Sequence, residues 1–119
     1  MNIATFNIRT GKEDWKIKEL ACLIDLYGIS VIAIQEHRRI HKEELLYEHM
    51  DDHLLVAAST WRNSAQAAVG GVGCLINKNS EAALCEINKI SDRIVRATFA
   101  GNPECTLIVA YAPTNCKQQ

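Results

Sequence analysis

The sequence lacks any long apolar run, since none of its hydrophobic stretches reaches the roughly 18 residues that a membrane-spanning helix needs. The first residues, MNIATFNIRT, have neither the charged start nor the apolar segment of a secretory signal peptide. An excess of charge is also missing, because 13 Lys and Arg residues stand against 14 Asp and Glu residues. We therefore expect no membrane association, and any nucleic-acid binding would depend on a local basic patch.

The sequence also lacks a Cys-x-x-Cys pair, which makes a zinc site improbable. Its cysteines are odd in number and widely spaced: Cys22, Cys74, Cys85, Cys105 and Cys116. Four of them sit among apolar residues that look like strands or helices, so we interpret them as reduced core thiols. We expect an intracellular protein, nuclear or cytoplasmic.

The chain of 119 residues has the length of one domain and contains no repeat, low-complexity stretch or linker. Residues 2–8 are expected to form a strand and residues 13–27 a helix, because apolar residues recur there at spacings of three and four. Gly28 is well placed to end that helix, and residues 30–35 have the composition of a second strand. The opening therefore predicts a β-α-β unit with two parallel strands.

Further along, residues 41–50 look like a short helix. The other predicted strands are residues 54–59, 71–77, 83–88, 93–100 and 105–112. One crossover helix followed by hairpin strands predicts a mixed β-sheet with flanking helices, in an α/β or α+β domain. Several strands are apolar at consecutive positions, which indicates that both of their faces need cover.

A β-α-β opening raises the possibility of a dinucleotide-binding fold, but the glycine pattern is missing. That fold requires G-x-G-x-x-G in the first turn, and here the turn NIRTGKED contains Gly11 alone. The later VGGVGCL continues as a strand and opens no helix that could receive a phosphate. We reject that interpretation.

Four stretches in order along the chain point elsewhere: ATFNIRT, IQEHR, GGVGCLI, and SDRIVRATF followed by LIVAYAPTN. This set resembles the endonuclease/exonuclease/phosphatase superfamily. NIRT, SDRI and YAPTN are most similar to its non-LTR retrotransposon branch and the domesticated craniofacial-development-protein-like relatives. The resemblance implies half of a four-layer α/β/β/α sandwich. Residues 1–119 would be the N-terminal part of one such domain, because its Asp-x-Asn and Ser-Asp-His motifs do not occur here.

The resemblance assigns roles to three residues. Glu36 occupies the place of the glutamate that binds the catalytic divalent cation, for which magnesium is expected and manganese is the alternative. Asn7 matches the asparagine that positions the metal and the phosphate, and Tyr111 the tyrosine that touches the scissile phosphate. The alternatives are a solvent-facing glutamate, an asparagine that caps a turn and a core tyrosine.

The resemblance also suggests phosphate or DNA contacts: Arg9, Arg38, Arg39, Thr114 and Asn115. Arg9 stands where abasic-site endonucleases carry an aspartate, which disfavours abasic-site cleavage. Arg38 and Arg39 belong to HRRIHK, a type of run that is more often a solvated helix face than a phosphate-binding patch.

Two smaller features remain open. Arg93 either contacts DNA or forms a structural pair with Asp92. His37 and His41 have i, i+4 spacing, but no third metal ligand is near them in the sequence, so a zinc site is disfavoured.

The sequence therefore predicts part of a metal-dependent DNA endonuclease domain, with DNA as partner and little or no activity from these residues alone. The alternatives are a non-catalytic binding or interaction module, or a phosphatase of the same superfamily. Because the two predicted helices can cover only one face of the sheet, the other face is expected to be bare and to promote self-association.

Overall fold

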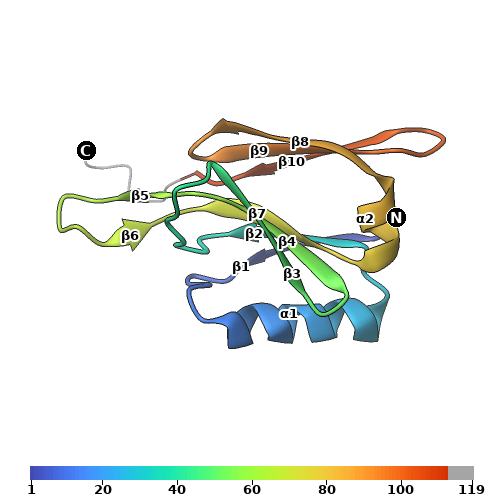
Figure 1. Ribbon diagram of the computed structural model, residues 1–119, viewed down its shortest axis with the longest axis horizontal. Coiled ribbons are helices and arrows are strands. Elements are labelled where there is room, and N and C mark those ends of the chain that lie inside the picture. The colour runs from blue at the N-terminus through green and yellow to red at the C-terminus, as the bar shows by residue number, and fades with distance from the viewer. Residues whose placement is uncertain (113–119) are drawn as a thin grey trace.

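In the computed structural model, which describes residues 1–112, the chain forms three layers: a helix, a five-stranded sheet and a three-stranded sheet (Figure 1). The elements in chain order are β1 (Ile3–Asn7), α1 (Asp14–Tyr27), β2 (Val31–Gln35), β3 (Leu45–Met50), β4 (His53–Ala58), β5 (Trp61–Arg62), β6 (Ala68–Val69), β7 (Val72–Ile76), α2 (Lys78–Ala83), β8 (Leu84–Ser91), β9 (Ile94–Phe99) and β10 (Cys105–Ala110). The predicted α+β class with a mixed sheet is confirmed.

The five-stranded sheet has the order β1-β2-β7-β4-β3. β1 and β2 are parallel, with Asn7 opposite Gln35, and the other neighbours are antiparallel. α1 is the crossover between the parallel strands, and it ends at Gly28, whose φ of 65° places it in the left-handed region. Buried Ile17 and Ile24 pack α1 against one face of the sheet. The predicted β-α-β unit is confirmed.

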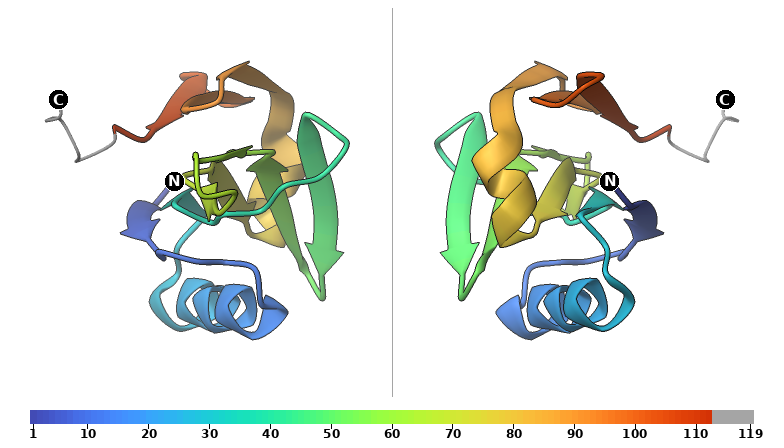
Figure 2. Two further views of the ribbon diagram at one scale, coloured as in Figure 1. Left: turned by 90° about the vertical axis from the view of Figure 1, so that its left-hand side faces the viewer. Right: turned by 90° about the vertical axis from the view of Figure 1, so that its right-hand side faces the viewer.

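The opposite face of this sheet is covered by the three-stranded sheet, whose order is β10-β9-β8 (Figure 2). Val56 and Ile76 of the first sheet share one buried cluster with Val95 and Phe99 of the second. The chain crosses between the sheets through α2 (Figure 1). The expectation of a bare sheet face is therefore wrong, because β8, β9 and β10 supply the cover.

Apolar surface remains at other places. Phe6 of the edge strand β1 is 47% exposed, and Ile3 and Leu23 beside it are also exposed. Ile108 on the outer face of β10 is exposed as well, so that strand is covered on one side only.

Three local features differ from the sequence-based prediction. The helix predicted at residues 41–50 is wrong, because Leu45–Met50 forms β3, paired antiparallel with β4 through a turn in which Asp51 has a φ of 58°. The short α2 was not expected, and it begins where the Asn77 side chain accepts a hydrogen bond from the Ser80 N–H at 2.7 Å. The small β5–β6 arm was not expected either.

The cysteines are only partly in the core. Cys74 is fully buried, and burial raises the pKa of its thiol to about 12. Cys22 and Cys85 are exposed and Cys105 is half-buried, so the interpretation as core thiols holds for Cys74 alone. All four are free thiols. Within residues 1–112, no helix has the length and apolar character to cross a membrane.

Candidate metal and phosphate site

Asn7 and Glu36 meet at one edge of the five-stranded sheet. Asn7 is the last residue of β1 and Glu36 directly follows β2, and parallel neighbours end at the same edge. The Asn7 amide Nδ2 donates a hydrogen bond to Glu36 Oε2 at 2.5 Å. The Glu36 side chain is 19% exposed and also faces Arg38, whose Nη2 lies 3.5 Å from Glu36 Oε1. The structure thus brings both predicted residues together around one carboxylate.

The backbone around this carboxylate has unusual conformations. Arg9, Glu36 and Arg38 all have φ near 60°, a region that non-glycine residues rarely occupy. Hydrogen bonds hold each of them in place. The Asn7 side-chain oxygen accepts from the Arg9 N–H at 3.1 Å, and the N–H groups of Glu36 and Arg38 donate to the carbonyls of Gly71 and Gly70 at 2.7 and 2.9 Å. Clustered strained residues of this kind are typical of functional sites.

The glycine pair Gly70–Gly71 allows the segment after β2 to lie this close to β7. A Cβ on Gly71 would lie 2.5 Å from the His37 ring, and one on Gly70 would lie 2.6 Å from the Trp61 ring. Both glycines have positive φ, 66° and 101°. The two glycines of GGVG therefore let the segment that carries Glu36 pack closely against the chain before β7. We assign them this structural role and not a role in phosphate binding.

His37 fixes the segment that carries Glu36. Its ring is buried, Nδ1 accepts a hydrogen bond from the Arg39 N–H at 2.9 Å, and Nε2 therefore carries the proton and donates to the Val72 carbonyl at 3.1 Å. Burial, together with the nearby Arg39 and His41, lowers the pKa of His37 to about 4. The ring is neutral at pH 7. Both of its nitrogen atoms are used in hydrogen bonds within the fold, so His37 has a structural role and is not a zinc ligand.

Tyr111 reaches the same region from the second sheet. Its N–H donates to the Arg93 carbonyl at 3.0 Å, and its side chain packs against the cluster between the sheets. Burial and then the Glu36 carboxylate raise the pKa of the Tyr111 hydroxyl, while Arg38 and Arg93 act in the opposite direction. A carboxylate and two guanidinium groups thus act on this phenol.

The predicted phosphate-contact residues differ in their surroundings. Arg9 is exposed beside Asn7, and Arg38 lies at the carboxylate. Arg39 is held within the fold: its Nε donates to the Gly11 carbonyl at 2.5 Å, and its two Nη atoms pair with Asp14 and Glu48 at 3.1 and 3.2 Å. Thr114 and Asn115 lie outside the described residues. Arg39 thus holds parts of the fold together, whereas the Arg38 guanidinium faces Glu36 and the Arg9 side chain is exposed.

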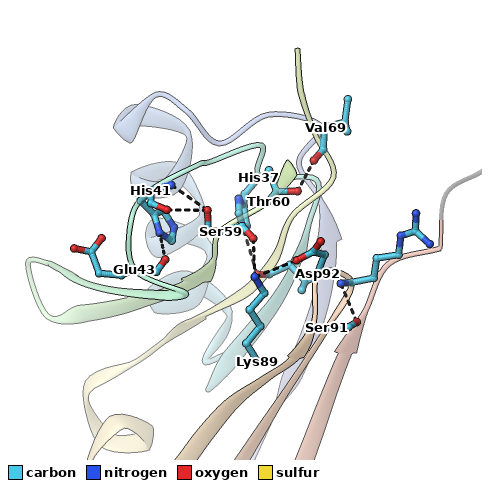
Figure 3. A network of polar contacts seen from close by, with 11 residues as sticks. His37, His41, Glu43, Ser59, Thr60, Val69, Lys89, Ser91 and Asp92 are labelled. Atoms are coloured by element: carbon cyan, nitrogen blue, oxygen red, sulfur yellow. Dashed lines mark hydrogen bonds and ion pairs between the residues drawn. The ribbon is translucent and has the colours of Figure 1, made fainter. Parts of the chain in front are cut away.

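A network of polar contacts joins the two sheets near this site (Figure 3). Ser59 Oγ bonds both the N–H and the carbonyl of His41 at 3.0 Å, and Lys89 donates to the Ser59 carbonyl at 3.3 Å. Lys89 also pairs with Asp92 at 3.1 Å. The sequence leaves open whether Arg93 pairs with Asp92 or contacts DNA. Within residues 1–112 Asp92 pairs with Lys89 and forms no ion pair with Arg93, so the first alternative is wrong. Sequence reasoning missed Ser59 and Lys89, which carry no local signal.

Arg93 instead stacks on an aromatic ring. Its guanidinium carbon lies 5.2 Å from the centroid of the Trp61 ring. Trp61 begins the β5–β6 arm, so this contact connects the arm to the turn between β8 and β9.

The donor set supports only a partial metal site. Within residues 1–112 no group of three His, Cys, Asp or Glu side chains comes close enough to hold an ion. A single carboxylate with water and phosphate oxygens suits Mg²⁺, which keeps much of its hydration, and disfavours zinc. In the observed orientation Asn7 presents its nitrogen to Glu36, so it orients the carboxylate and would need an amide flip to become a ligand.

The described residues thus provide one hard-cation ligand, Glu36, with the Arg38 guanidinium 3.5 Å away and with the Tyr111 phenol close enough for the carboxylate to raise its pKa. These groups can hold a divalent cation and a phosphate together but include no general base. A search for matching models of known protein families and a search of curated protein sequences both give no match.

Proposed function

We propose that Glu36, Asn7 and Tyr111 form the metal- and phosphate-binding part of a magnesium-dependent DNA endonuclease site, of the endonuclease/exonuclease/phosphatase type that the sequence motifs resemble. The observation that carries the proposal is the contact between Asn7 and Glu36 at the shared end of β1 and β2. Tyr111, which directly follows β10 and whose pKa is raised by burial and then by the Glu36 carboxylate, supports it. An intracellular location, nuclear or cytoplasmic, belongs to this proposal.

In this proposal each residue has one task. Glu36 would hold Mg²⁺, or Mn²⁺ in its place, and the ion supplies Lewis-acid stabilisation of charge on a phosphoryl oxygen. Asn7 fixes the Glu36 rotamer through its Nδ2. The Tyr111 hydroxyl is protonated at neutral pH, as in any tyrosine whose pKa is not lowered, so it can donate a hydrogen bond to the phosphate. Arg9 and Arg38 offset the charge of the bound phosphodiester.

Metal binding tests this site directly. We expect weak Mn²⁺ binding by the protein, measured by the electron paramagnetic resonance of free Mn²⁺, and at least about a tenfold loss in Glu36→Gln. Glu86→Gln is the matched control, because Glu86 is an exposed glutamate on β8 of the other sheet. Equal Mn²⁺ affinity in Glu36→Gln and Glu86→Gln would contradict the proposal.

Nicking of supercoiled plasmid tests what this chain can do alone. We expect wild-type protein with Mg²⁺ to nick no faster than Glu36→Ala, because the described site contains no group placed to act as general base. Fast nicking that is lost in Glu36→Ala would show that a base has been overlooked.

One observation favours the second candidate, a non-catalytic DNA-binding module: within residues 1–112, no group of three His, Cys, Asp or Glu side chains gathers around Glu36 to hold an ion. Such a module would bind DNA equally well with and without a divalent cation. DNA binding that strengthens with Mg²⁺ in wild-type protein, but not in Glu36→Gln, would favour the endonuclease site instead.

A further inference from the structure

A second polar feature lies beside the Glu36 site, between the β5–β6 arm and the segment after β2. It is a groove of about 360 Å³, and four cationic side chains line it: Lys12, Arg38, Arg39 and Arg62. None of the described residues that line it is acidic. We call it the basic groove. A concave surface with one sign of charge concentrates ligands of the opposite sign.

The cations of the basic groove are not all neutralised within the protein. Arg39 is paired with Asp14 and Glu48, and Arg38 makes one contact of 3.5 Å with Glu36. Lys12 and Arg62 take part in no ion pair among the described residues, and both are exposed. The groove therefore keeps a net positive charge for an anionic ligand.

Two buried nitrogen atoms on the basic groove have no hydrogen-bond partner within residues 1–112: Arg38 Nε and His41 Nε2. A buried, unpaired donor such as the Arg38 N–H is costly, of the order of 1–3 kcal/mol, unless an acceptor reaches it. His41 Nδ1 donates to the Glu43 carbonyl at 2.6 Å, so Nε2 of the neutral ring is an acceptor and gives an anion no hydrogen bond. Arg38 Nε thus has no acceptor among the described residues, and a shift of this side chain toward a phosphate bound in the groove would give it one.

The β5–β6 arm that forms one wall is held in shape by its own contacts. The Asn63 side-chain oxygen accepts from the N–H groups of Ala65 and Ala67 at 2.9 and 3.1 Å, and Arg62 donates to the Gln66 carbonyl at 2.9 Å. At its base, Thr60 bonds the Val69 carbonyl (Figure 3). A preformed wall reduces the ordering cost of binding.

We propose that the basic groove binds the sugar–phosphate backbone of the same DNA strand that reaches Glu36, at the nucleotides next to the metal site, with Lys12 and Arg62 as phosphate contacts. Arg38 belongs to both places, since it lines the groove and contacts Glu36. A strand held in the groove would thus be continuous with the metal site. The choice of DNA as the ligand rests on the proposed function, whereas the anion-binding character rests on the groove itself.

The test is fluorescence anisotropy of a short labelled DNA duplex in EDTA, so that metal binding plays no part. We expect Arg62→Ala and Lys12→Ala each to weaken binding by about three- to tenfold and to lower the slope of log affinity against log salt by about one. The matched controls are Arg96→Ala, on the outer face of β9, and Lys78→Ala, on α2 at the opposite end from the arm (Figure 1). These controls should bind like wild type.

Several outcomes would overturn the proposal. Arg62→Ala and Lys12→Ala could behave like the controls, or they could weaken binding of a labelled RNA and leave DNA unchanged. Displacement of the duplex by inorganic phosphate at constant ionic strength would make the groove a site for the free ion. Arg62→Ala also removes the hydrogen bond to the Gln66 carbonyl within the arm and could unfold it. In that case Lys12→Ala, which leaves the arm intact, is the variant that tests the proposal.

The same experiments separate this proposal from the proposed function. Mn²⁺ binding that depends on Glu36, with DNA binding indifferent to Lys12 and Arg62, would overturn only the groove. DNA binding that depends on Lys12 and Arg62, with Mn²⁺ binding indifferent to Glu36, would overturn only the metal site.

Discussion

Replacement of Gly71 by alanine is expected to lower the free energy of unfolding by roughly 3–5 kcal/mol, from backbone strain and a buried clash together. Gly71 has a φ of 101°, which an alanine adopts only with strain. The new Cβ would also lie 2.5 Å from Cε1 and 2.7 Å from Nδ1 of the buried His37 ring. The ring cannot move away without losing its hydrogen bonds to Arg39 and Val72.

Equilibrium unfolding in urea measures this effect, and Gly28→Ala is the matched control. Gly28 also has a positive φ, 65°, but no atom lies within 4 Å of the position that its Cβ would take. Gly28→Ala should therefore cost only about 1–2 kcal/mol, the strain of a left-handed residue. A loss in Gly71→Ala no larger than that in Gly28→Ala would contradict the role given to the His37 contact.

A double-mutant cycle assigns the clash to its partner. In His37→Ala the space beside Gly71 is open, so the added Gly71→Ala change should cost little more than the strain at φ 101°. We expect a strongly non-additive pair. Additive losses would show that the backbone of Gly71, and not the His37 ring, sets the requirement for glycine.

The sequence correctly predicts the part of the site that depends on the β-α-β unit at the start of the chain. The strand-like composition of residues 2–8 and 30–35, the helical period of three to four between them and Gly28 predict β1, α1 and β2. Since the crossover makes the strands parallel neighbours, Asn7 and Glu36 must finish at the same edge. Their proximity follows from these few rules, although their roles do not.

The wrong helix at residues 41–50 shows where such local rules fail. His41–Glu44 contains good helix formers, yet Leu46 and Glu48 lie opposite Ala57 and Leu55 in the hairpin with β4. Tertiary pairing overrides a weak local preference. Glu48 as a strand residue also reaches Arg39, a contact that a helix would place differently.

The support beneath Glu36 was beyond sequence reasoning for a similar reason. Trp61 and Gly70 meet only because β5 and β6 pair, and His37 meets Gly71 only because β2 lies beside β7. Each of these contacts joins residues that are distant in the sequence. Without the sheet order, Gly70 and Gly71 could be recognised only as part of a sequence motif. The close contacts that require glycine at these two positions could not be predicted.

Acidification is expected to destabilise the protein through His37, with a loss of about 3 kcal/mol between pH 6.5 and pH 4. The pKa of the ring is lowered from 6.5 to about 4, first by burial, then by the charges of Arg39 and His41, with a hydrogen bond to Val72 in partial opposition. Between these values the unfolded chain binds a proton and the folded chain does not. Stability is therefore complete above pH 6.5 and falls as the pH drops toward 4.

The pH dependence of urea unfolding in wild type and in His37→Gln measures this contribution, because glutamine does not titrate and both chains share all other groups. The wild-type curve should be steeper by about 1.4 kcal/mol per pH unit in this window. If His37→Gln does not fold, nuclear magnetic resonance of the wild-type His37 ring decides. Its Cε1 proton signal should stay constant from pH 7 to pH 5, whereas a titration midpoint near 6.5 would refute the buried neutral ring.

Protonation of His37 is also expected to weaken metal binding at Glu36. A proton on Nδ1 would face the Arg39 N–H, so two donors would meet where one hydrogen bond of 2.9 Å now holds the segment. The His37 carbonyl accepts a hydrogen bond from the Gly11 N–H, and Glu36 directly precedes His37 in the chain. A displacement of the His37 backbone would therefore also displace Glu36. Mn²⁺ binding should accordingly weaken in acid together with the loss of stability. Urea unfolding of Glu36→Gln, which keeps His37, across the same pH series separates the loss of stability from the loss of metal binding.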